Sequence, residues 1–229
     1  MSMKEDYAAN KLQTIKAGKS EESLYVDSTM IDIDIKLCGE GPKLIIRNPL
    51  NEIVKGDELS MSNLMIVCIK NPMPGKWTVE TESSSGYTVQ MGSNSELKIK
   101  YGFSSGAPKN HGETSVLPLK GKKSVLSFFI SDPTKIKYLS NAVLALEKDE
   151  DVAGKSTRRK RELQLSIPRE IKLKLTKIAP NTYISEAFDA PEGMFKVQLK
   201  GVDSNGNQVE RLVSTAVESV EPSKLVLYD

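Results

Sequence analysis

The residues best suited to catalysis in this chain are few and isolated. His111 is the single histidine among 229 residues, so a Ser-His-Asp arrangement would have to use it, and a histidine metal cluster is excluded. It lies in GFSSGAPKNHGETS, a Gly-, Ser- and Pro-rich stretch typical of a linker rather than of the rigid support that catalytic geometry requires. Neither GxGxxG nor GxxxxGK[ST] occurs. These residue types predict a protein that is not an enzyme and binds no cofactor.

The two cysteines, Cys38 and Cys68, are compatible with either a disulfide or two free thiols. Their separation excludes a CxxC motif, and two cysteines do not make a zinc site alone. Cys38 ends an alternating segment and Cys68 lies in an apolar one. Adjacent antiparallel strands could bring their Cα atoms within the ~7 Å that a disulfide needs, and an extracellular protein would oxidise such a pair. The spacing leaves both states open.

The most pointed local feature is a basic run in KSTRRKRE (155–162), next to the acidic run 147–151. It fits a furin-type processing site, because the small residues before it favour exposure to proteases. It equally fits a binding site for sulfated glycans or another polyanion, a nuclear import signal, or a solvated loop screened by the neighbouring acids. The side chains concerned are Lys155, Arg158, Arg159, Lys160 and Arg161.

Two further features have a functional and a structural interpretation. Asp203, Asn205 and Asn207 alternate like calcium ligands, but Ser214 stands where the loop would need an acidic residue, and Asn205-Gly206 is a hairpin signal.

Trp77 could stack on a sugar, yet it opens an alternating strand and is the only tryptophan. A buried position is therefore the favoured interpretation of Trp77, because burial uses its large apolar area.

These residues must be positioned by strands, because nearly everything after residue 25 alternates with period two or is a short apolar run. In MIDIDIKLC, Ile31, Ile33, Ile35 and Leu37 share one face, as an antiparallel sheet with one wet side requires. Turn residues separate the runs, and no helix lies between them, which favours β-sandwiches. The first set of expected strands is 31–38, 43–47, 64–69, a strand from Trp77, 87–91 and 97–103.

A second set of strands follows a linker at 105–115. Seven short strands in about a hundred residues are typical of an immunoglobulin-like sandwich, although the Cys…Trp…Cys core of antibody domains is absent. Residues 3–17 have capping-box spacing and one apolar face, so they predict a short N-terminal helix. The expected organisation is a helix and linker at 1–21, a sandwich at 22–104, the linker, a second sandwich at 116–222 and a tail at 223–229.

Charge and hydropathy exclude some partners. The net charge is +2, which gives no general attraction for nucleic acid, and no apolar run approaches the ~18 residues of a membrane span. The N-terminus MSMKEDYAANKLQ has no apolar core of a signal peptide. The chain is therefore expected to be either cytoplasmic or a piece of a longer secreted protein. No Asn-x-Ser/Thr sequon is present.

Several motifs, in order, resemble hemicentins and related von Willebrand A domain-containing proteins, in the region after the A domain. The similar segments are VDSTMIDIDIKLCGEGPKLIIRNPLNEIVK with its Arg47-Asn48-Pro49 turn, and NPMPGKWTVETESSSGYTVQMGSNSELKIKYGFS with Trp77-Thr78-Val79 and Gly102-Phe103-Ser104. FDAPEGMFKVQLKGVDSNGNQVERLVSTAVESVEPS resembles the last strands of that region. The resemblance covers roughly residues 22–222 and is weakest at 132–170. It implies a galactose-binding-like sandwich followed by an Ig-like one, with the N-terminal helix as the tail of an A domain.

The resemblance also implies a function. It indicates a non-enzymatic, secreted matrix or adhesion module that contacts matrix or cell-surface proteins. Independently of the resemblance, the charges of the basic run make it the candidate binding surface, with sulfated glycan as the ligand. The alternatives are a carbohydrate-binding module that uses loops of the first sandwich, and a cytosolic β-rich scaffold. A galactose-binding-like label names a fold and does not establish sugar binding. Edge strands in two sandwiches leave self-association open.

Overall fold

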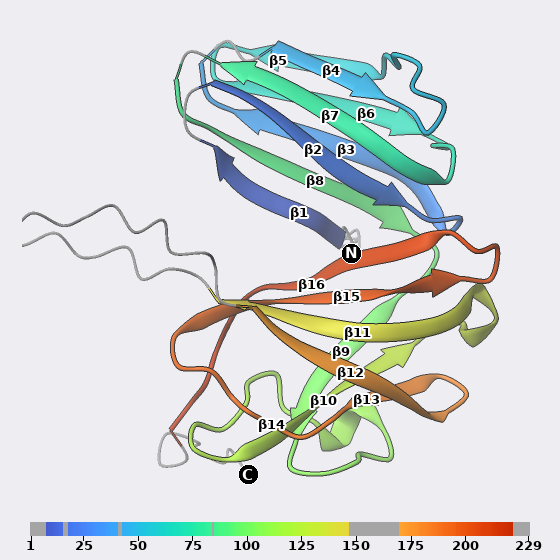
Figure 1. Cartoon of the computed structure of the whole chain (residues 1–229), viewed down its shortest axis with the longest axis vertical. Helices are drawn as coiled ribbons and strands as arrows, with labels where there is room; N and C mark the ends of the chain where they lie inside the picture. The colour runs from blue at the N-terminus through green and yellow to red at the C-terminus, as the bar shows by residue number, and fades with distance from the viewer. Residues whose placement is uncertain (1–7, 16–17, 41–42, 84, 147–169, 222–229) are drawn as a thin grey trace, which may run out of the picture.

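The computed structural model describes residues 8–15, 18–40, 43–83, 85–146 and 170–221. Within them the chain is built of antiparallel strands and two single-turn 3-10 helices, which confirms the all-β prediction (Figure 1). None of the helices in these ranges is long and apolar enough to cross a bilayer. The strands are β1 (Ala8–Ile15), β2 (Gly18–Val26), β3 (Met30–Cys38), β4 (Lys43–Arg47), β5 (Asp57–Met61), β6 (Leu64–Lys70), β7 (Gly75–Ser83), β8 (Tyr87–Ser95), β9 (Ile99–Ser104), β10 (Lys123–Ile130), β11 (Ile136–Leu146), β12 (Glu170–Ala179), β13 (Thr182–Ser185), β14 (Phe188–Asp189), β15 (Met194–Asp203) and β16 (Gln208–Glu218). The 3-10 helices are η1 (His111–Glu113) and η2 (Pro133–Lys135).

The first sandwich packs the sheet β1-β8-β3-β6-β5 against the smaller sheet β2-β7-β4. The alternation in β3 has the predicted effect for Ile33, Ile35 and Leu37, which are fully buried. They belong to one apolar cluster with Trp77 and Val79 of β7. The period-two pattern of the sequence therefore determines which face of each strand enters this core. The prediction is wrong for Ile31, which is 47% exposed, because the pairing of β3 with β8 shifts register between Met30 and Asp32.

The predicted N-terminal helix is wrong for the part of it that the structure describes. Ala8–Ile15 is a strand that pairs antiparallel with β8, from Ala8 opposite Ser93 to Ile15 opposite Tyr87. A short segment with weak helical periodicity does not form a stable helix by itself. The open edge of β8 offers hydrogen-bonding partners to the backbone groups of this segment. β1 thereby completes one side of the first sandwich, and it also contacts β16.

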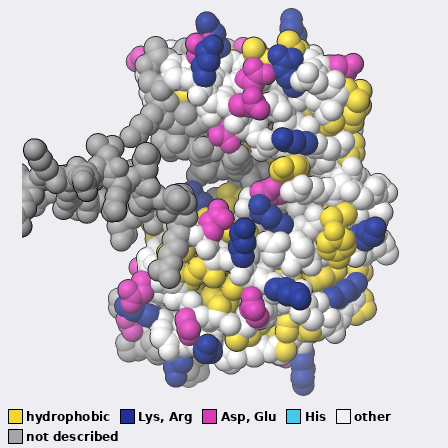
Figure 2. Space-filling view, viewed as in Figure 1, with side chains coloured by type: hydrophobic (Ala, Val, Ile, Leu, Met, Phe, Trp, Pro, Cys, Tyr) yellow, Lys and Arg dark blue, Asp and Glu magenta, His cyan; other side chains and the backbone are white. Residues whose placement is uncertain are grey.

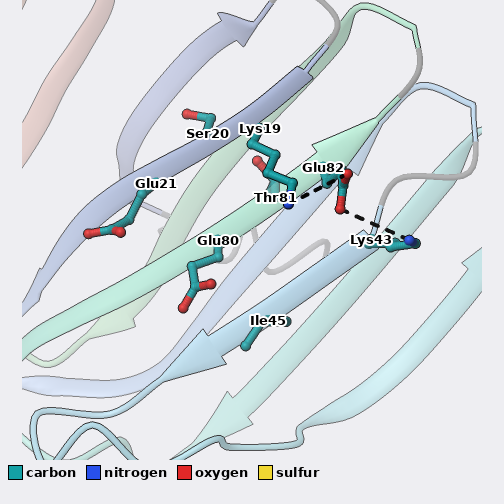
Figure 3. A pocket seen from close by; sticks show the side chains of 8 residues that line it. All are labelled: Lys19, Ser20, Glu21, Lys43, Ile45, Glu80, Thr81 and Glu82. Carbon is teal, nitrogen blue, oxygen red and sulfur yellow. Dashed lines mark ion pairs between the residues drawn. The ribbon is translucent and has the colours of Figure 1, made fainter.

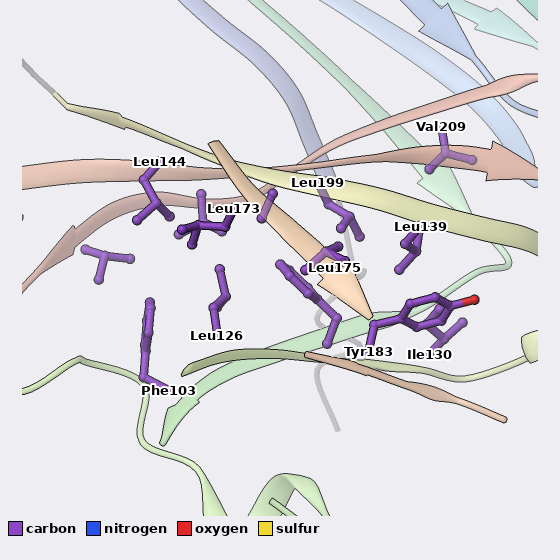
Figure 4. Close-up of a cluster of buried hydrophobic side chains, with 14 of the residues drawn as sticks. Phe103, Leu126, Ile130, Leu139, Leu144, Leu173, Leu175, Tyr183, Leu199 and Val209 are labelled. Atoms are coloured by element: carbon purple, nitrogen blue, oxygen red, sulfur yellow. The ribbon is translucent and has the colours of Figure 1, made fainter. Parts of the chain in front are cut away.

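The second sandwich is a sheet that folds over its own core, in the order β14-β10-β13-β12-β11-β15-β16, with β9 also paired to β10. Figure 4 shows the apolar side chains between its layers. The fully buried members include Leu126, Phe128, Leu144, Phe195 and Leu199. One of the seven strands expected in the second set, RELQLSI at 161–167, lies outside the described residues.

The strand expected to close the first sandwich belongs to the second one. β9 pairs with β10 along its whole length, from Ile99 opposite Ile130 to Ser104 opposite Val125. Phe103 explains this position, because it is 2% exposed and packs edge-on against Phe188 and Phe195 of the second core. The segment expected to be a linker returns to β9, where Ser115 pairs with Phe103.

Candidate functional site

A buried ion pair joins the two sandwiches. Arg211 of β16 approaches Asp27, which follows β2, with Nη2 at 2.7 Å from Oδ2 and side-chain exposures of 3% and 0%. The same Nη2 donates to the hydroxyls of Thr29 (3.2 Å) and Ser95 (3.1 Å). Burial lowers the pKa of Arg211, whereas the charge of Asp27 and its hydrogen bond raise it. Arginine remains charged in proteins, so this is a desolvated cation held by first-sandwich oxygens.

Asp203, a candidate calcium ligand in the sequence, makes a second polar contact between the sandwiches. Its carboxylate accepts the backbone N–H of Asn205 (3.0 Å) and of Asn207 (2.7 Å), which shapes the turn from β15 to β16. It also accepts the N–H of Ser28 from the first sandwich at 2.9 Å. Burial alone would raise the pKa of Asp203, but these hydrogen bonds outweigh it and lower the pKa. The hairpin prediction is confirmed. The contact between Asp203 and Ser28 was not predicted.

Trp77 is a core residue, as favoured from the sequence. Its side chain is 2% exposed, and its indole N–H donates to the carbonyl of Met73 at 2.8 Å. A sugar therefore has no access to this ring. Any carbohydrate-binding interpretation of the first sandwich has to rely on other residues.

The cysteines are free, which makes the disulfide alternative wrong for this fold. Cys38 lies opposite Leu64, and Cys68 lies opposite Asp34, so they are four positions apart along the paired strands β3 and β6. Four positions span about 13 Å, well beyond disulfide reach. Burial, together with the hydrogen bond to Asp34 and its charge, raises the pKa of Cys68 to about 11.

His111 has a structural position and no catalytic surroundings. It is exposed in η1, where Nε2 lies 3.1 Å from the carbonyl oxygen of Tyr101, and its ring stands edge-on to Phe129 with 5.5 Å between centroids. These contacts hold η1 against β9 and β10. No group of three or more His, Cys, Asp or Glu suited to a metal occurs among the described residues.

The basic run at Lys155, Arg158, Arg159, Lys160 and Arg161 lies outside the described residues. The two strands on either side of it in the sequence, β11 and β12, instead carry a hollow of about 430 Å³ that the sequence reasoning missed. The sequence pattern that could have indicated this hollow is the alternation in β12, where Lys172 and Lys174 are exposed and Leu173 and Leu175 are buried. The hollow is lined by Ser140, Asn141, Val143, Lys172, Lys174, Glu186 and Lys200.

Register explains why the lysines of this hollow converge. Asn141 of β11 pairs with Lys174 on one side and with Lys200 of β15 on the other, so two ammonium groups flank one amide. Lys200 lies 3.4 Å from Glu210, whereas no ion pair of Lys172 or Lys174 is found within the described ranges. The hollow is thus locally basic, although Figure 2 shows basic, acidic and apolar side chains interspersed on the face that it draws.

A second hollow, of about 410 Å³, lies on the outer face of β2-β7-β4 in the first sandwich. Figure 3 shows Lys19 and Lys43 reaching Glu82 from the neighbouring strands, at 3.9 Å and 4.0 Å. Glu21 and Glu80 also line it, so three carboxylates accompany its two ammonium groups. This hollow has less attraction for a charged ligand than the lysine-lined one.

Comparison with known proteins agrees with the motifs in the sequence. Residues 9–96 match the family model of the hemicentin galactose-binding domain-like region. The chain is 24% identical to Hemicentin-2 of Mus musculus over 93% of its length, and 23% identical to mouse Hemicentin-1 over 86%. It is 29% identical to Hemicentin-1 of Homo sapiens over 49% of its length.

The chain spans only a small part of these relatives, from 2% to 4% of their length. Among solved structures, the Bacillus licheniformis lipase BlEst2 in propeptide form superimposes with a TM-score of 0.46 at 12% identity, covering 97% of this chain and 43% of that one. That likeness is too low to carry an argument. The predicted resemblance is confirmed by these comparisons: residues 9–96 match the hemicentin galactose-binding domain-like model, and the chain is similar to hemicentins over most of its length.

Proposed function

We propose that this chain is a non-enzymatic module of an extracellular matrix or adhesion protein, in which two coupled sandwiches form a binding surface for matrix or cell-surface components. The match of residues 9–96 to the hemicentin galactose-binding domain-like family carries the proposal. The imidazole of His111 contacts a backbone carbonyl and an aromatic ring, and these structural contacts support a binding role over a catalytic one.

The coupling of the sandwiches suits such a role. A binding surface that transmits load or spans a gap needs a fixed relation between its parts. The buried Arg211–Asp27 pair and the Asp203–Ser28 hydrogen bond supply that relation, because each contact has its hydrogen-bonding geometry only in one relative position of the two sandwiches.

Sulfated glycan is the ligand class that the charges favour. Lysine is a compact point charge suited to sulfate, and the lysine-lined hollow adds the hydroxyl of Ser140 and the amide of Asn141 as hydrogen-bonding groups for sugar. The basic run from Lys155 to Arg161 is joined in sequence to the same two strands. The hollow and the run are the two proposed contributors to glycan contact.

Heparin affinity of the whole chain tests this function. Lys172→Gln combined with Lys174→Gln is expected to weaken binding about two- to tenfold, because an exposed ion pair is worth up to about 1 kcal/mol. Binding of the unchanged protein should also fall with added salt. Lys55→Gln combined with Lys76→Gln is the matched control, since both lysines are exposed on the first sandwich and the net charge change is equal.

Neutralising Arg158, Arg159, Lys160 and Arg161 to glutamine separates the contribution of the run from that of the hollow. Glycan contact is ruled out if heparin retains the unchanged chain no more strongly than it retains the hollow variant and the basic-run variant.

The extracellular assignment has its own test, in the mass of the native protein recovered from culture medium and from cells. Recovery from the cytosol alone would contradict it, whatever the heparin result.

A further inference from the structure

Tyr138 of β11 is an exposed aromatic residue on the outer face of the second sandwich. It is 47% exposed, whereas every other Phe, Tyr and Trp among the described residues is buried or half-buried. Burial of an aromatic ring stabilises a fold through its large apolar area. Tyr138 gains little of that stabilisation, so core formation does not explain an aromatic residue at this position.

Two irregularities in the pairing of β11 with β15 direct Tyr138 outward. The register shifts between Ile136 and Tyr138, and again between Leu139 and Asn141. Strict alternation from the buried Ile136 would place Tyr138 in the core, but Leu139 is buried there instead. A β-bulge re-aims side chains in this way. The second shift leaves both Ser140 and Asn141 outside the core, where they line the hollow.

The ring therefore lies on the same sheet face as the lysine-lined hollow. Tyr138 pairs with Val202 of β15. Val202 and Lys200 are two positions apart on that strand, about 7 Å, so their side chains share a face. Lys200 lines the hollow and pairs with Asn141. Figure 1 shows β11 between β12 and β15, the two strands that carry the lysines of the hollow.

The lysines of the hollow attract anions without selecting a sugar. Lys172 and Lys174 are about 7 Å apart along β12, and Lys174 and Lys200 are about 10 Å apart across β11. These positions suit a chain that carries several anionic groups better than one small anion. An ammonium group is a point charge and meets sulfate, phosphate and carboxylate alike. Selectivity for a glycan has to come from another side chain.

We infer that Tyr138 makes the lysine-lined hollow selective for glycans, by stacking its ring on the face of a pyranose whose sulfate groups contact the lysines. A pyranose presents C–H groups on its faces and hydroxyl or sulfate groups at its rim, so an aromatic ring beside cations matches both parts. A polyphosphate chain carries the charges and lacks such a face. The inference rests on the proposed glycan contact of the hollow.

Two ligands of matched charge, a heparin oligosaccharide and an inorganic polyphosphate, separate stacking from charge attraction when each is titrated into the full chain. Tyr138→Ala is expected to weaken heparin binding about three- to tenfold and to change polyphosphate binding by less than about twofold. Tyr138→Phe should bind both ligands as the unchanged protein does, because it keeps the ring. Circular dichroism establishes that the variants retain their strands.

The matched control is Tyr25→Ala. Tyr25 is half-buried on β2 of the first sandwich, between the buried Leu24 and Val26, so its ring is on the outer face of the other sandwich. Its removal should leave the binding of both ligands unchanged.

Nitration of tyrosine gives a readout that needs no variant. Tetranitromethane should modify the exposed Tyr138 in the free protein, as peptide mass mapping measures. At equal occupancy of the hollow, heparin should protect Tyr138 and polyphosphate should protect it less. Equal protection by the two ligands would contradict stacking.

The outcomes distinguish this inference from the proposed function. If Lys172→Gln combined with Lys174→Gln weakens heparin binding and Tyr138→Ala does not, the role of Tyr138 is overturned and the glycan contact stands. An equal loss of heparin and polyphosphate binding in Tyr138→Ala would also overturn it, because the residue would then only maintain the shape of the hollow. Absence of heparin binding by the unchanged protein would overturn both.

Discussion

Arg211 and Asp27 are 2.7 Å apart across the boundary between the two sandwiches, and neither side chain is appreciably exposed to water. Asp27 also accepts the backbone N–H and the hydroxyl of Thr29, at 3.0 Å and 2.6 Å. Thr29 and Ser95 in turn accept from the guanidinium group. The first sandwich thus provides a polar pocket for one cation, and the second sandwich provides the cation. Each sandwich carries a buried charge that only the other compensates.

Removing one member of this pair should be costly. We expect Arg211→Met to lower the free energy of unfolding by about 3–5 kcal/mol, because it leaves the carboxylate of Asp27 buried without its countercharge. Combining Arg211→Met with Asp27→Leu should recover much of the loss, since no buried charge remains. Denaturant titration followed by circular dichroism measures both values.

The control for that series is Arg47→Met. Arg47 pairs with Glu80 at 2.6 Å, but the side chains are 28% and 37% exposed, so the expected loss is below about 1 kcal/mol. An Arg211→Met variant no less stable than Arg47→Met would contradict the assigned role of the buried pair.

Stability in acid should depend on Asp203. Hydrogen bonds lower its pKa below the ordinary value of 3.8, so its contribution to folding is present above that pH and is lost as the pH falls through the lower, folded-state pKa. Asp203→Asn should therefore be less stable at neutral pH, and its stability should fall less steeply below about pH 4. Asp189→Asn, which changes an exposed carboxylate, is the control. Equal acid slopes for the unchanged protein and Asp203→Asn would contradict the shift.

The two thiols should react at very different rates. Cys38 is exposed, whereas the pKa of Cys68 is about 11, which leaves only ~0.1% of it as the nucleophilic thiolate at pH 8. Alkylation of the native protein at pH 8, followed by peptide mass mapping, should therefore label Cys38 first. Simultaneous labelling of both cysteines would argue against the raised pKa. A native mass lower by two hydrogens would show a disulfide and contradict the β3–β6 register.

Trp77 should report on folding and not on ligands. Trp77→Ala is expected to destabilise the first sandwich by about 3–5 kcal/mol, because it leaves a cavity among Val79 and its neighbours in the core. In the unchanged protein, emission from this single tryptophan should be that of an apolar environment and should not move when glycans are added. A shift caused by a sugar would show that the ring is accessible, against its 2% exposure.

Local sequence patterns were sufficient to predict the structure of β3 and of the β15–β16 turn. Alternation in MIDIDIKLC predicted the buried face of β3, and Asn205-Gly206 predicted the hairpin, because both depend on neighbours in sequence. The position of Trp77 followed from the same alternation. The helix prediction failed at residues 8–15 because weak local periodicity gave way to pairing with β8, a strand more than seventy residues away.

The sequence by itself determined the fold class and the hemicentin resemblance, since these depend on residue types and on their order along the chain. Only the tertiary structure decided that β9 belongs to the second sandwich, that Cys38 and Cys68 are four positions apart, and that Arg211 neutralises Asp27. It also placed β5 at one edge of the five-stranded sheet. The physical reason is the same in each case. Strand order, register and the contact between sandwiches are set by the total of many non-local contacts, and no short window of sequence contains them.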